Sequence, residues 1–222
     1  RFPFGQPCAA VLNGDSDGCA PGGLHLAFDL AEEHGVRYSL YLMKQQFDSL
    51  SSNEVSDLRG RGHDVGLHPW HGSQPTVEEM RLGLLRDYAT FQERYGYVPT
   101  NTRHHSVVTA GWTETQETLA EIGVRLDLNF CPGRGFQWGF LNGSARSMRM
   151  SRADGTLVDL YQHSTLTTDD GILTDKTGLP ALSLDEAILL SERLIVQLHE
   201  EWQGVYLPYF HPIYFEENAP FT

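Results

Sequence analysis

The segment Arg61–Ser73, RGHDVGLHPWHGS, carries three histidines within nine residues, at His63, His68 and His71. Imidazole rings bind metal ions, carry protons in catalysis or occupy ordinary polar positions in a fold. A metal site needs several ligands of suitable chemistry, so this segment alone does not decide between these roles. The other polar clusters of the chain have to be considered with it.

A second group of residues able to do chemistry follows the first apolar run of the chain, Ala9–Leu12. Two carboxylates, Asp15 and Asp17, stand there with one serine between them. Carboxylates and imidazoles together suit zinc and related metals better than calcium or magnesium. Gly-Asp-Ser-Asp-Gly is also ordinary turn chemistry, so a polar turn is the alternative for this pair. Polar groups also follow later apolar segments or, in the case of Asp127 and Asn129, lie within one. The groups that follow such segments are Arg103, His104, His105, His163, Thr165, Asp169, Asp170 and His211.

The elements that must position these side chains alternate between strand and helix. The clearest helix is predicted at residues 76–95, where Thr76 and Glu79 form a capping-box signature and apolar residues recur at helical spacing. Further helices are predicted at residues 23–34, 52–59, 113–122 and 184–202. Strands are predicted at residues 9–12, 37–43, 64–67, 99–104, 124–130, 157–161 and 205–210.

This alternation favours a parallel sheet with crossover helices, and we expect an α/β fold, a distorted (β/α) barrel with about seven parallel strands. One domain is expected over residues 1–222, with an inserted loop or hairpin at 131–156, a stretch rich in glycine, arginine and aromatic residues. In parallel α/β folds the chemistry lies at the carboxyl ends of the strands. The carboxylates, imidazoles and Arg103 should therefore meet on one rim.

The overall composition excludes some classes of partner. The chain has 222 residues, 29 of them acidic and 16 basic, which gives a formal net charge of −13. Such a surface repels phosphate backbones, so we expect neither nucleic acid nor an anionic membrane surface as a partner. No run approaches the roughly 20 apolar residues that a membrane span needs. The oligomeric state is not defined by the sequence.

The cysteines and the start of the chain give information about the cellular compartment of the protein. The chain begins at Arg1 without a basic-then-apolar leader, so we expect a mature or excised piece, from a secreted or extracytoplasmic protein. Cys8, Cys19 and Cys131 form no Cys-x-x-Cys pair, so a structural zinc cluster is not expected. A disulfide between Cys8 and Cys19 stays open, because it depends on an oxidising compartment.

These motifs resemble the polysaccharide deacetylase superfamily, also called the NodB-homology or carbohydrate esterase 4 fold. The first family motif, a strand that ends in two carboxylates, is matched by Asp15 and Asp17. The second, Gly-His-Glu-Ile-Gly-x-His, is similar to Gly62–His68. An arginine after the next strand and a histidine after the last strand are matched by Arg103 and His211. The four motifs keep the family's order and span nearly the whole chain.

The chain also departs from the family's pattern at two motifs. The carboxylates are usually adjacent, whereas Ser16 separates them in this sequence. The family has a further histidine four residues after His68, but position 72 is Gly72, and His71 comes one residue early. A divergent branch of the superfamily has Arg-Asn-His in the third motif, which Arg103–His105 resembles. The third metal ligand is therefore either the last histidine of this motif or His71.

The resemblance implies a metal-dependent hydrolase that removes N- or O-acetyl groups from a carbohydrate, with zinc as the expected metal and cobalt or nickel as alternatives. The implied metal ligands are Asp17, His68 and either His105 or His71. The implied catalytic residues are Asp15 as general base, His211 as general acid and Arg103 as the partner of Asp15.

Four further residues are expected to contribute to the substrate pocket. Aromatic faces suit the C–H surfaces of sugars, so Trp70 and Trp138 are candidates for stacking on sugar rings. His163 is a candidate pocket residue or a histidine of the core. Asp127 is a candidate for the pocket and for orienting His211.

Two other functions are compatible with the sequence. A C–N hydrolase that acts on a small non-sugar amide would use the same fold and the same residues. A degenerate carbohydrate-binding or accessory domain without catalysis is the other, because the first and second motifs are altered. Bound metal would distinguish both hydrolases from the degenerate domain.

Overall fold

The computed structural model describes residue 2, residues 5–132 and residues 137–215. The helices are α1 (Pro21–Glu33), α2 (Ser52–Gly60), α3 (Val77–Tyr95), α4 (Glu114–Ile122), α5 (Asp169–Leu173) and α6 (Leu184–Gln197). The strands are β1 (Ala9–Ala10), β2 (Leu12–Asp15), β3 (Tyr38–Leu42), β4 (Asp64–Leu67), β5 (Asn101–Thr102), β6 (Leu126–Phe130), β7 (Met148–Ser151), β8 (Leu157–Ser164), β9 (Thr167–Thr168), β10 (Val205–Tyr206) and β11 (Pro208–Tyr209).

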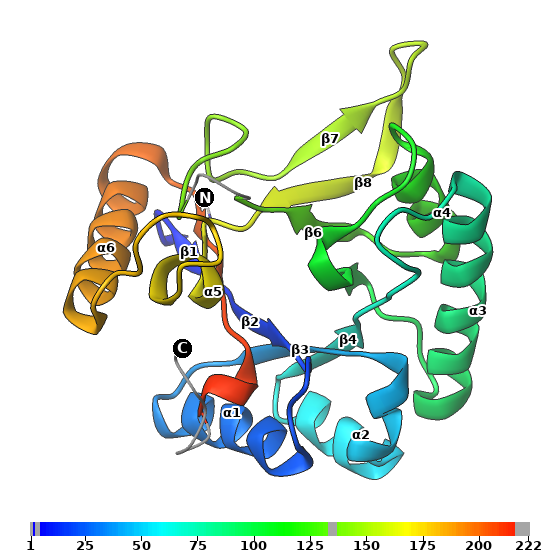
Figure 1. The fold of residues 1–222 in the computed structure, drawn as a ribbon, viewed down its shortest axis with the longest axis horizontal. Coiled ribbons are helices and arrows are strands. Elements are labelled where there is room, and N and C mark those ends of the chain that lie inside the picture. Colours follow the sequence, from blue (N-terminus) through cyan, green and yellow to red (C-terminus); the bar gives the residue numbers. More distant parts are fainter. Residues whose placement is uncertain (1, 3–4, 133–136, 216–222) are drawn as a thin grey trace.

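A curled nine-stranded sheet forms the centre of the fold, with α1–α4 packed along its outer side (Figure 1). The order of its strands is β7-β8-β6-β5-β4-β3-β2-β11-β9, and β1 pairs with β10 in a separate two-stranded sheet. Within the described ranges, each neighbouring pair is parallel except β7–β8. The expected distorted (β/α) barrel is confirmed.

The main core lies between this sheet and its helices. Buried apolar residues of β3 and β4, such as Leu40 and Val65, pack with Phe28 of α1 and Leu84 of α3 in one cluster. Helix α3 begins with the predicted capping box at Thr76 and ends at Gly96, whose backbone is left-handed. Burial of this apolar face holds the strands in place, and their carboxyl ends are thereby fixed relative to one another.

The first strand differs from its prediction, because the polar residues expected to form a turn belong to β2. Asn13, Gly14 and Asp15 pair in register with β3 on one side, and Asn13 pairs with β11 on the other. The side chain of Asn13 also donates to the carbonyl oxygen of Pro208 at 2.7 Å. Sheet hydrogen bonds thus outweigh the local turn preference, and β2 carries Asp15 to the end of the sheet.

Gly14 is required where β2 passes the end of the last strand. A Cβ atom at this position would collide with the carbonyl oxygen of Phe210 and the hydroxyl of Tyr38. We predict that Gly14→Ala lowers the free energy of unfolding by about 3 kcal/mol, because backbone atoms on the neighbouring strand cannot move aside cheaply. Urea unfolding followed by circular dichroism measures the change.

Gly22, in the first turn of α1, is the matched control for this substitution. A Cβ atom there would meet nothing within 4 Å, so Gly22→Ala should leave stability unchanged or raise it by about 0.5–1 kcal/mol. Equal effects of the two substitutions would contradict the close packing at Gly14.

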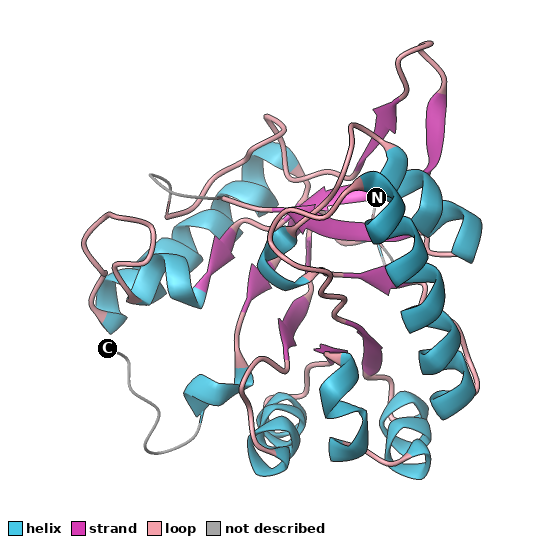
Figure 2. Ribbon diagram, turned by 45° about the vertical axis from the view of Figure 1, so that its right-hand side comes forward, coloured by secondary structure: helices cyan, strands magenta, loops and turns pink. Residues whose placement is uncertain are grey.

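Strand β7 and the following strand form a hairpin that extends from one edge of the sheet (Figures 1 and 2). Strand β7 lies within the stretch 131–156, which the sequence predicts to be an inserted loop or hairpin. Residues 133–136 of this stretch lie outside the described residues.

The last helix and strand are more divided than predicted. Helix α6 ends at Gln197 and continues as a π-helical turn at Leu198–Trp202, which closes at Gln203 with left-handed backbone. Among the apolar residues of the predicted helix 184–202, Leu194 and Leu198 are buried, whereas Leu184, Ile188 and Ile195 have exposed side chains. The predicted strand 205–210 is split into β10 and β11, which pair in different sheets.

Two further expectations concern helices and cysteines. None of the helices in the described ranges combines the length and the apolar character that a membrane span requires. Cys8 and Cys19 form no disulfide in the structure.

Candidate active site

The carboxyl ends of adjacent strands meet at a cleft of about 560 Å³. Strand β2 ends at Asp15, and Asp17 follows in the next turn. Strand β4 leads directly to His68, and β5 leads to Arg103 and the turn that carries His105. Short strand β11 is followed by His211. The structure thus brings residues of all four sequence motifs to one rim of the sheet.

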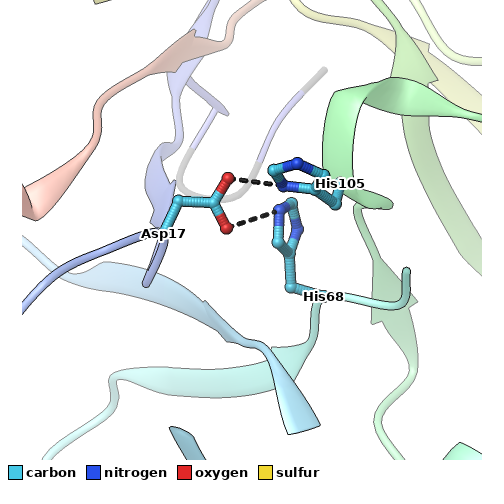
Figure 3. A group of neighbouring side chains, drawn as sticks. All are labelled: Asp17, His68 and His105. Atoms are coloured by element: carbon cyan, nitrogen blue, oxygen red, sulfur yellow. Dashed lines mark ion pairs between the residues drawn. The ribbon is translucent and has the colours of Figure 1, made fainter. Parts of the chain in front are cut away.

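Asp17, His68 and His105 form a close group at this rim (Figure 3). One carboxylate oxygen of Asp17, Oδ1, lies 3.3 Å from Nε2 of His68. The other, Oδ2, lies 2.5 Å from Nδ1 of His105. Each residue offers an atom within 4.8 Å of the others, so this group can hold a metal ion.

His68 is oriented by a hydrogen bond at the far side of its ring. Its Nδ1 lies 2.8 Å from the carbonyl oxygen of Arg103, which can only accept, so Nδ1 donates and Nε2 is directed at the carboxylates. Metal-binding histidines are held by bonds of this kind, which fix the tautomer and the ring orientation. Burial alone would lower the pKa of His68, but Asp15 and Asp17 raise it to about 9.

The chemistry of this group fits a divalent metal. Asp17 Oδ1, His68 Nε2 and His105 Nδ1 are buried and make no aligned hydrogen bond to the described residues. Buried polar atoms of this kind are costly unless a partner satisfies them. Burial raises the pKa of Asp17, but the imidazoles of His105 and His68 outweigh it and lower the pKa, so the carboxylate is ionised. One carboxylate and two imidazoles directed at a common point are a typical ligand set for zinc.

His71 lies outside this group. Its Nε2 is 3.6 Å from Oδ2 of Asp87 on α3, and its ring fills the space beside Gly83. Burial lowers the pKa of His71, more than the nearby Asp87 raises it. Of the two alternatives for the third ligand, His105 is therefore the one that lies beside Asp17. The side chain of His71 points toward α3 instead.

His63 is a structural histidine, as its position at the start of the strand predicts. Its Nδ1 accepts a hydrogen bond from the backbone of Tyr38 at 3.1 Å, and its Nε2 lies 3.0 Å from Glu32. The ring also packs edge-on against Phe28.

Asp15 lies between the metal-binding group and the last histidine. Its Oδ2 is 3.0 Å from Nε2 of His68, and its Oδ1 is 3.7 Å from Nε2 of His211. Its Oδ1 also accepts a hydrogen bond from the backbone N–H of Asp17 at 3.2 Å. The side chain is 2% exposed and lines the cleft, so it can act on a group bound there and is otherwise shielded from water.

His211 is held by Asp169, a role that the sequence pattern did not indicate. Nδ1 of His211 lies 2.6 Å from Oδ1 of Asp169, and its backbone N–H donates to Oδ2 at 2.5 Å. Burial would lower the pKa of His211, but the bond to Asp169 and the charge of Asp15 raise it to about 9. Asp169 follows the two-residue strand β9, which is too short to recognise from sequence, and Asp-Asp-Gly at 169–171 is typical of a turn.

Asp127 does not orient His211 and does not line the cleft, contrary to expectation. It is fully buried, and its oxygens accept hydrogen bonds from the side chains of Gln116 and Gln162 and the backbone of Asn129. It stabilises β6 and β8 behind the site.

Arg103 lines the cleft, but the expected ion pair with Asp15 is not among the contacts of the described residues. Its Nη2 donates to Oδ1 of Asn13 at 3.1 Å and to Oγ1 of Thr165 at 2.6 Å. Its guanidinium lies 4.0 Å from the centre of the Tyr209 ring. Side chains alternate along a strand, so Asn13 shares the face of Asp15 and takes the contact in its place.

The other expected pocket residues, Trp70, Trp138 and His163, do not line the cleft. Trp70 is 41% exposed, and its ring meets that of His105 edge-on at 4.6 Å between centroids. Trp138 is 43% exposed and pairs through its backbone with Thr167. His163 is buried, and its Nδ1 contacts the hydroxyl of Ser147 at 3.2 Å. Of the three, Trp70 is the one that contacts a residue of the metal-binding group.

The turn that carries His105 has unusual backbone geometry. Ser106 and Val107 have φ angles of 53° and 51°, in the left-handed region that β-branched residues rarely adopt. Both residues line the cleft beside His105. Such conformations persist where the surrounding structure holds them, and they often occur at functional sites.

Comparisons with known proteins agree with this geometry at the level of fold. No family model and no curated protein matches the sequence. A protein from Mycobacterium smegmatis, provisionally assigned as a polysaccharide deacetylase, has a TM-score of 0.70 and 17% identity over 96% of this chain and 79% of its own. One from Bordetella bronchiseptica, provisionally assigned as a polysaccharide deacetylase involved in O-antigen biosynthesis, has a TM-score of 0.58 and 18% identity over 92% and 72%.

A pseudoenzyme of the CE4 family from Bacillus anthracis is also similar, with a TM-score of 0.53 and 11% identity over 94% of this chain and 56% of its own. The chain therefore has the fold of the polysaccharide deacetylases, and the resemblance seen in the sequence is confirmed for the fold. Since one fold hosts active and inactive proteins, function has to be argued from the site.

Proposed function

We propose that this chain is a metal-dependent hydrolase that removes acetyl groups from a carbohydrate. The observation that carries the proposal is the group Asp17, His68 and His105. Asp17 and His105 line the cleft together with Asp15 and His211, and His68 lies buried against both carboxylates. A ligand set with a neighbouring carboxylate and a neighbouring imidazole supplies the parts that acyl hydrolysis needs.

The metal would be held by Asp17, His68 through Nε2 and His105 through Nδ1. When bound, a divalent metal lowers the pKa of a water molecule and polarises an acyl carbonyl oxygen. Zinc is the proposed ion, with cobalt or nickel as alternatives, because one carboxylate and two imidazoles suit all three.

The chain's own residues divide the proton transfers between them. Asp15 removes the proton of the attacking water, and its neighbouring backbone N–H from Asp17 keeps the carboxylate in place. His211 is protonated near neutrality because its pKa is raised to about 9, so it can donate to the leaving amine or alcohol. Arg103 adds a buried positive charge behind the cleft and anchors His68 through its backbone carbonyl oxygen.

The split carboxylate pair does not by itself indicate a degenerate site. Although Ser16 separates Asp15 and Asp17, both carboxylates reach Nε2 of His68, at 3.0 Å and 3.3 Å. Ser16 is buried, and its hydroxyl bonds with Gln46 and the backbone of Met43. The extra residue is therefore accommodated away from the cleft, which favours an active hydrolase over a binding domain.

The role of Asp169 gives a prediction for the pH dependence. Replacing Asp169 with asparagine removes the charge that raises the pKa of His211. Since His211 must be protonated to act as an acid, activity is lost as pH rises through its pKa. We expect the alkaline limb of kcat/KM to move to lower pH by about one unit or more. A pH–rate profile measures this, and the exposed Asp175→Asn should leave it unchanged.

Two measurements test the proposed function together. Metal analysis of purified chain loaded with zinc should find about one ion per chain. Acetate release should be seen with an N-acetylglucosamine trisaccharide or an acetylated xylo-oligosaccharide. Release from small amides alone would favour the C–N hydrolase. If the chain bound no metal and released acetate from none of these substrates, the proposal would be overturned in favour of a non-catalytic domain.

A further inference from the structure

The cleft has a second polar cluster on the side of His211, made by Asp170 of α5, Lys176 and Tyr214. Oδ1 of Asp170 accepts a hydrogen bond from Nζ of Lys176 at 2.8 Å and from the hydroxyl of Tyr214 at 2.6 Å. All three residues line the cleft, and none is used by the proton transfers described above.

This cluster leaves one acceptor and one donor side by side. The other oxygen of Asp170, Oδ2, makes no hydrogen bond in the described part of the chain and is not a buried atom. Lys176 has three N–H groups, and its two recorded contacts are with Asp170 and the Tyr214 hydroxyl, the latter at 3.3 Å. Its side chain is 58% exposed, so the remaining donor is accessible.

The cluster is adjacent to the proposed acid. An oxygen of Asp170 lies within 4.8 Å of a ring nitrogen of His211, in a group that also includes Asp169. A substrate whose leaving atom receives the proton of His211 can therefore place a neighbouring substituent close to Asp170. In a sugar, that substituent is the hydroxyl beside the acylated position.

The charge of the cluster suits a neutral group. Burial raises the pKa of Asp170, but Lys176 and Tyr214 outweigh it and lower the pKa; Asp170 in turn raises the pKa of Lys176 against the effect of burial. Both groups are thus charged near neutrality, and their charges cancel. A hydroxyl can donate to Oδ2 and accept from Nζ at once, whereas an ionised carboxylate or phosphate could accept from Nζ but has no proton to donate to Oδ2.

We propose that Asp170 and Lys176 form a subsite for the sugar hydroxyl next to the acylated position, with Tyr214 holding Asp170 in place. The inference rests on the proposed function and adds a specificity to it. The hydroxyl donates to Asp170 Oδ2 and accepts from Lys176 Nζ, so the enzyme requires that hydroxyl to be free.

The test removes the two sides of this contact separately and together. The probes are an N-acetylglucosamine trisaccharide and a matched trisaccharide without the hydroxyl beside each acetamido group. Wild-type chain should lose about ten- to a hundredfold in kcat/KM with the deoxy probe, the range for a hydrogen bond to a charged group. Lys176→Met should have a kcat/KM lower than that of the wild type by a similar factor with the parent probe. With the deoxy probe, its kcat/KM should be close to that of the wild type, because the contact is already absent.

Lys44→Met is the matched control, because Lys44 is the chain's only other lysine and also pairs with an aspartate, Asp87, at 3.1 Å. It does not line the cleft, so both probes should react as in the wild type. A second readout is the equilibrium binding of each probe to zinc-loaded Asp15→Asn chain. Adding Lys176→Met to this variant should lower the affinity for the parent probe and leave the affinity for the deoxy probe unchanged.

The outcomes separate this inference from the proposed function. Suppose that wild-type chain releases acetate, but that Lys176→Met lowers kcat/KM by the same factor for both probes or for neither. The subsite is then overturned and the hydrolase stands. An equal loss for both probes would show that the pair of Asp170 and Lys176 only stabilises α5. If wild-type chain releases no acetate from any acetylated glycan, the proposed function fails, and the subsite fails with it.

Discussion

Replacing His68 with alanine is expected to lower zinc affinity by more than about 100-fold. Losing a residue that only hydrogen-bonds to a metal ligand already costs about 10–100-fold, and the loss of a ligand itself should cost more. His68 Nε2 is buried and directed at both carboxylates, so its loss removes a ligand that the fold holds in place. Hydrolysis should be lost with the metal. Isothermal titration calorimetry with zinc measures the affinity directly.

His71→Ala is the control for this substitution, because His71 belongs to the same short segment. Its imidazole faces Asp87 on α3, so zinc affinity should stay within about threefold of the wild type, a difference of about 0.7 kcal/mol or less. If His71→Ala weakened zinc as much as His68→Ala did, the assignment of His105 as the third ligand would be wrong.

Replacing Asp15 with asparagine is expected to lower kcat for acetate release by about 10²–10⁴-fold, the usual contribution of a general base. The amide keeps the shape of the side chain but cannot accept the proton of the attacking water. Zinc affinity should fall much less than in His68→Ala, because Asp15 is not one of the proposed ligands. Steady-state kinetics and zinc titration on the same preparation give both values.

Asp29→Asn, an exposed position on α1, controls for the general effect of removing one negative charge. It should leave both kcat and zinc affinity unchanged. Full activity of Asp15→Asn would contradict the role of this carboxylate and would point to another base in the cleft.

Much of the site could be predicted from the sequence because strand ends carry it. Asp15, His68 and His211 each follow an apolar run, and parallel strands bring their carboxyl ends to one edge. The α/β alternation and the capped helix α3 were equally readable, since long apolar patterns and caps act locally. The position of each site residue along the edge of the sheet then follows from the order of the strands.

The remainder depends on contacts that local patterns do not encode. Asp169 looks like a turn residue, and only the pairing of β9 with β11 places it against His211. His71 and His105 could not be separated by spacing, because the loop after β4 decides which way the ring points. Asn13 displaced Asp15 as the partner of Arg103 for a similar reason, since β2 extends further than its turn-like sequence suggests.

The most direct test of the proposed metal site is a crystal structure of the chain grown with zinc, with the ion located by its anomalous scattering. The account predicts one peak within about 2.0–2.2 Å of an oxygen of Asp17, Nε2 of His68 and Nδ1 of His105. A peak bound by His71 and Asp87 instead, or no peak at this group at saturating zinc, would contradict it.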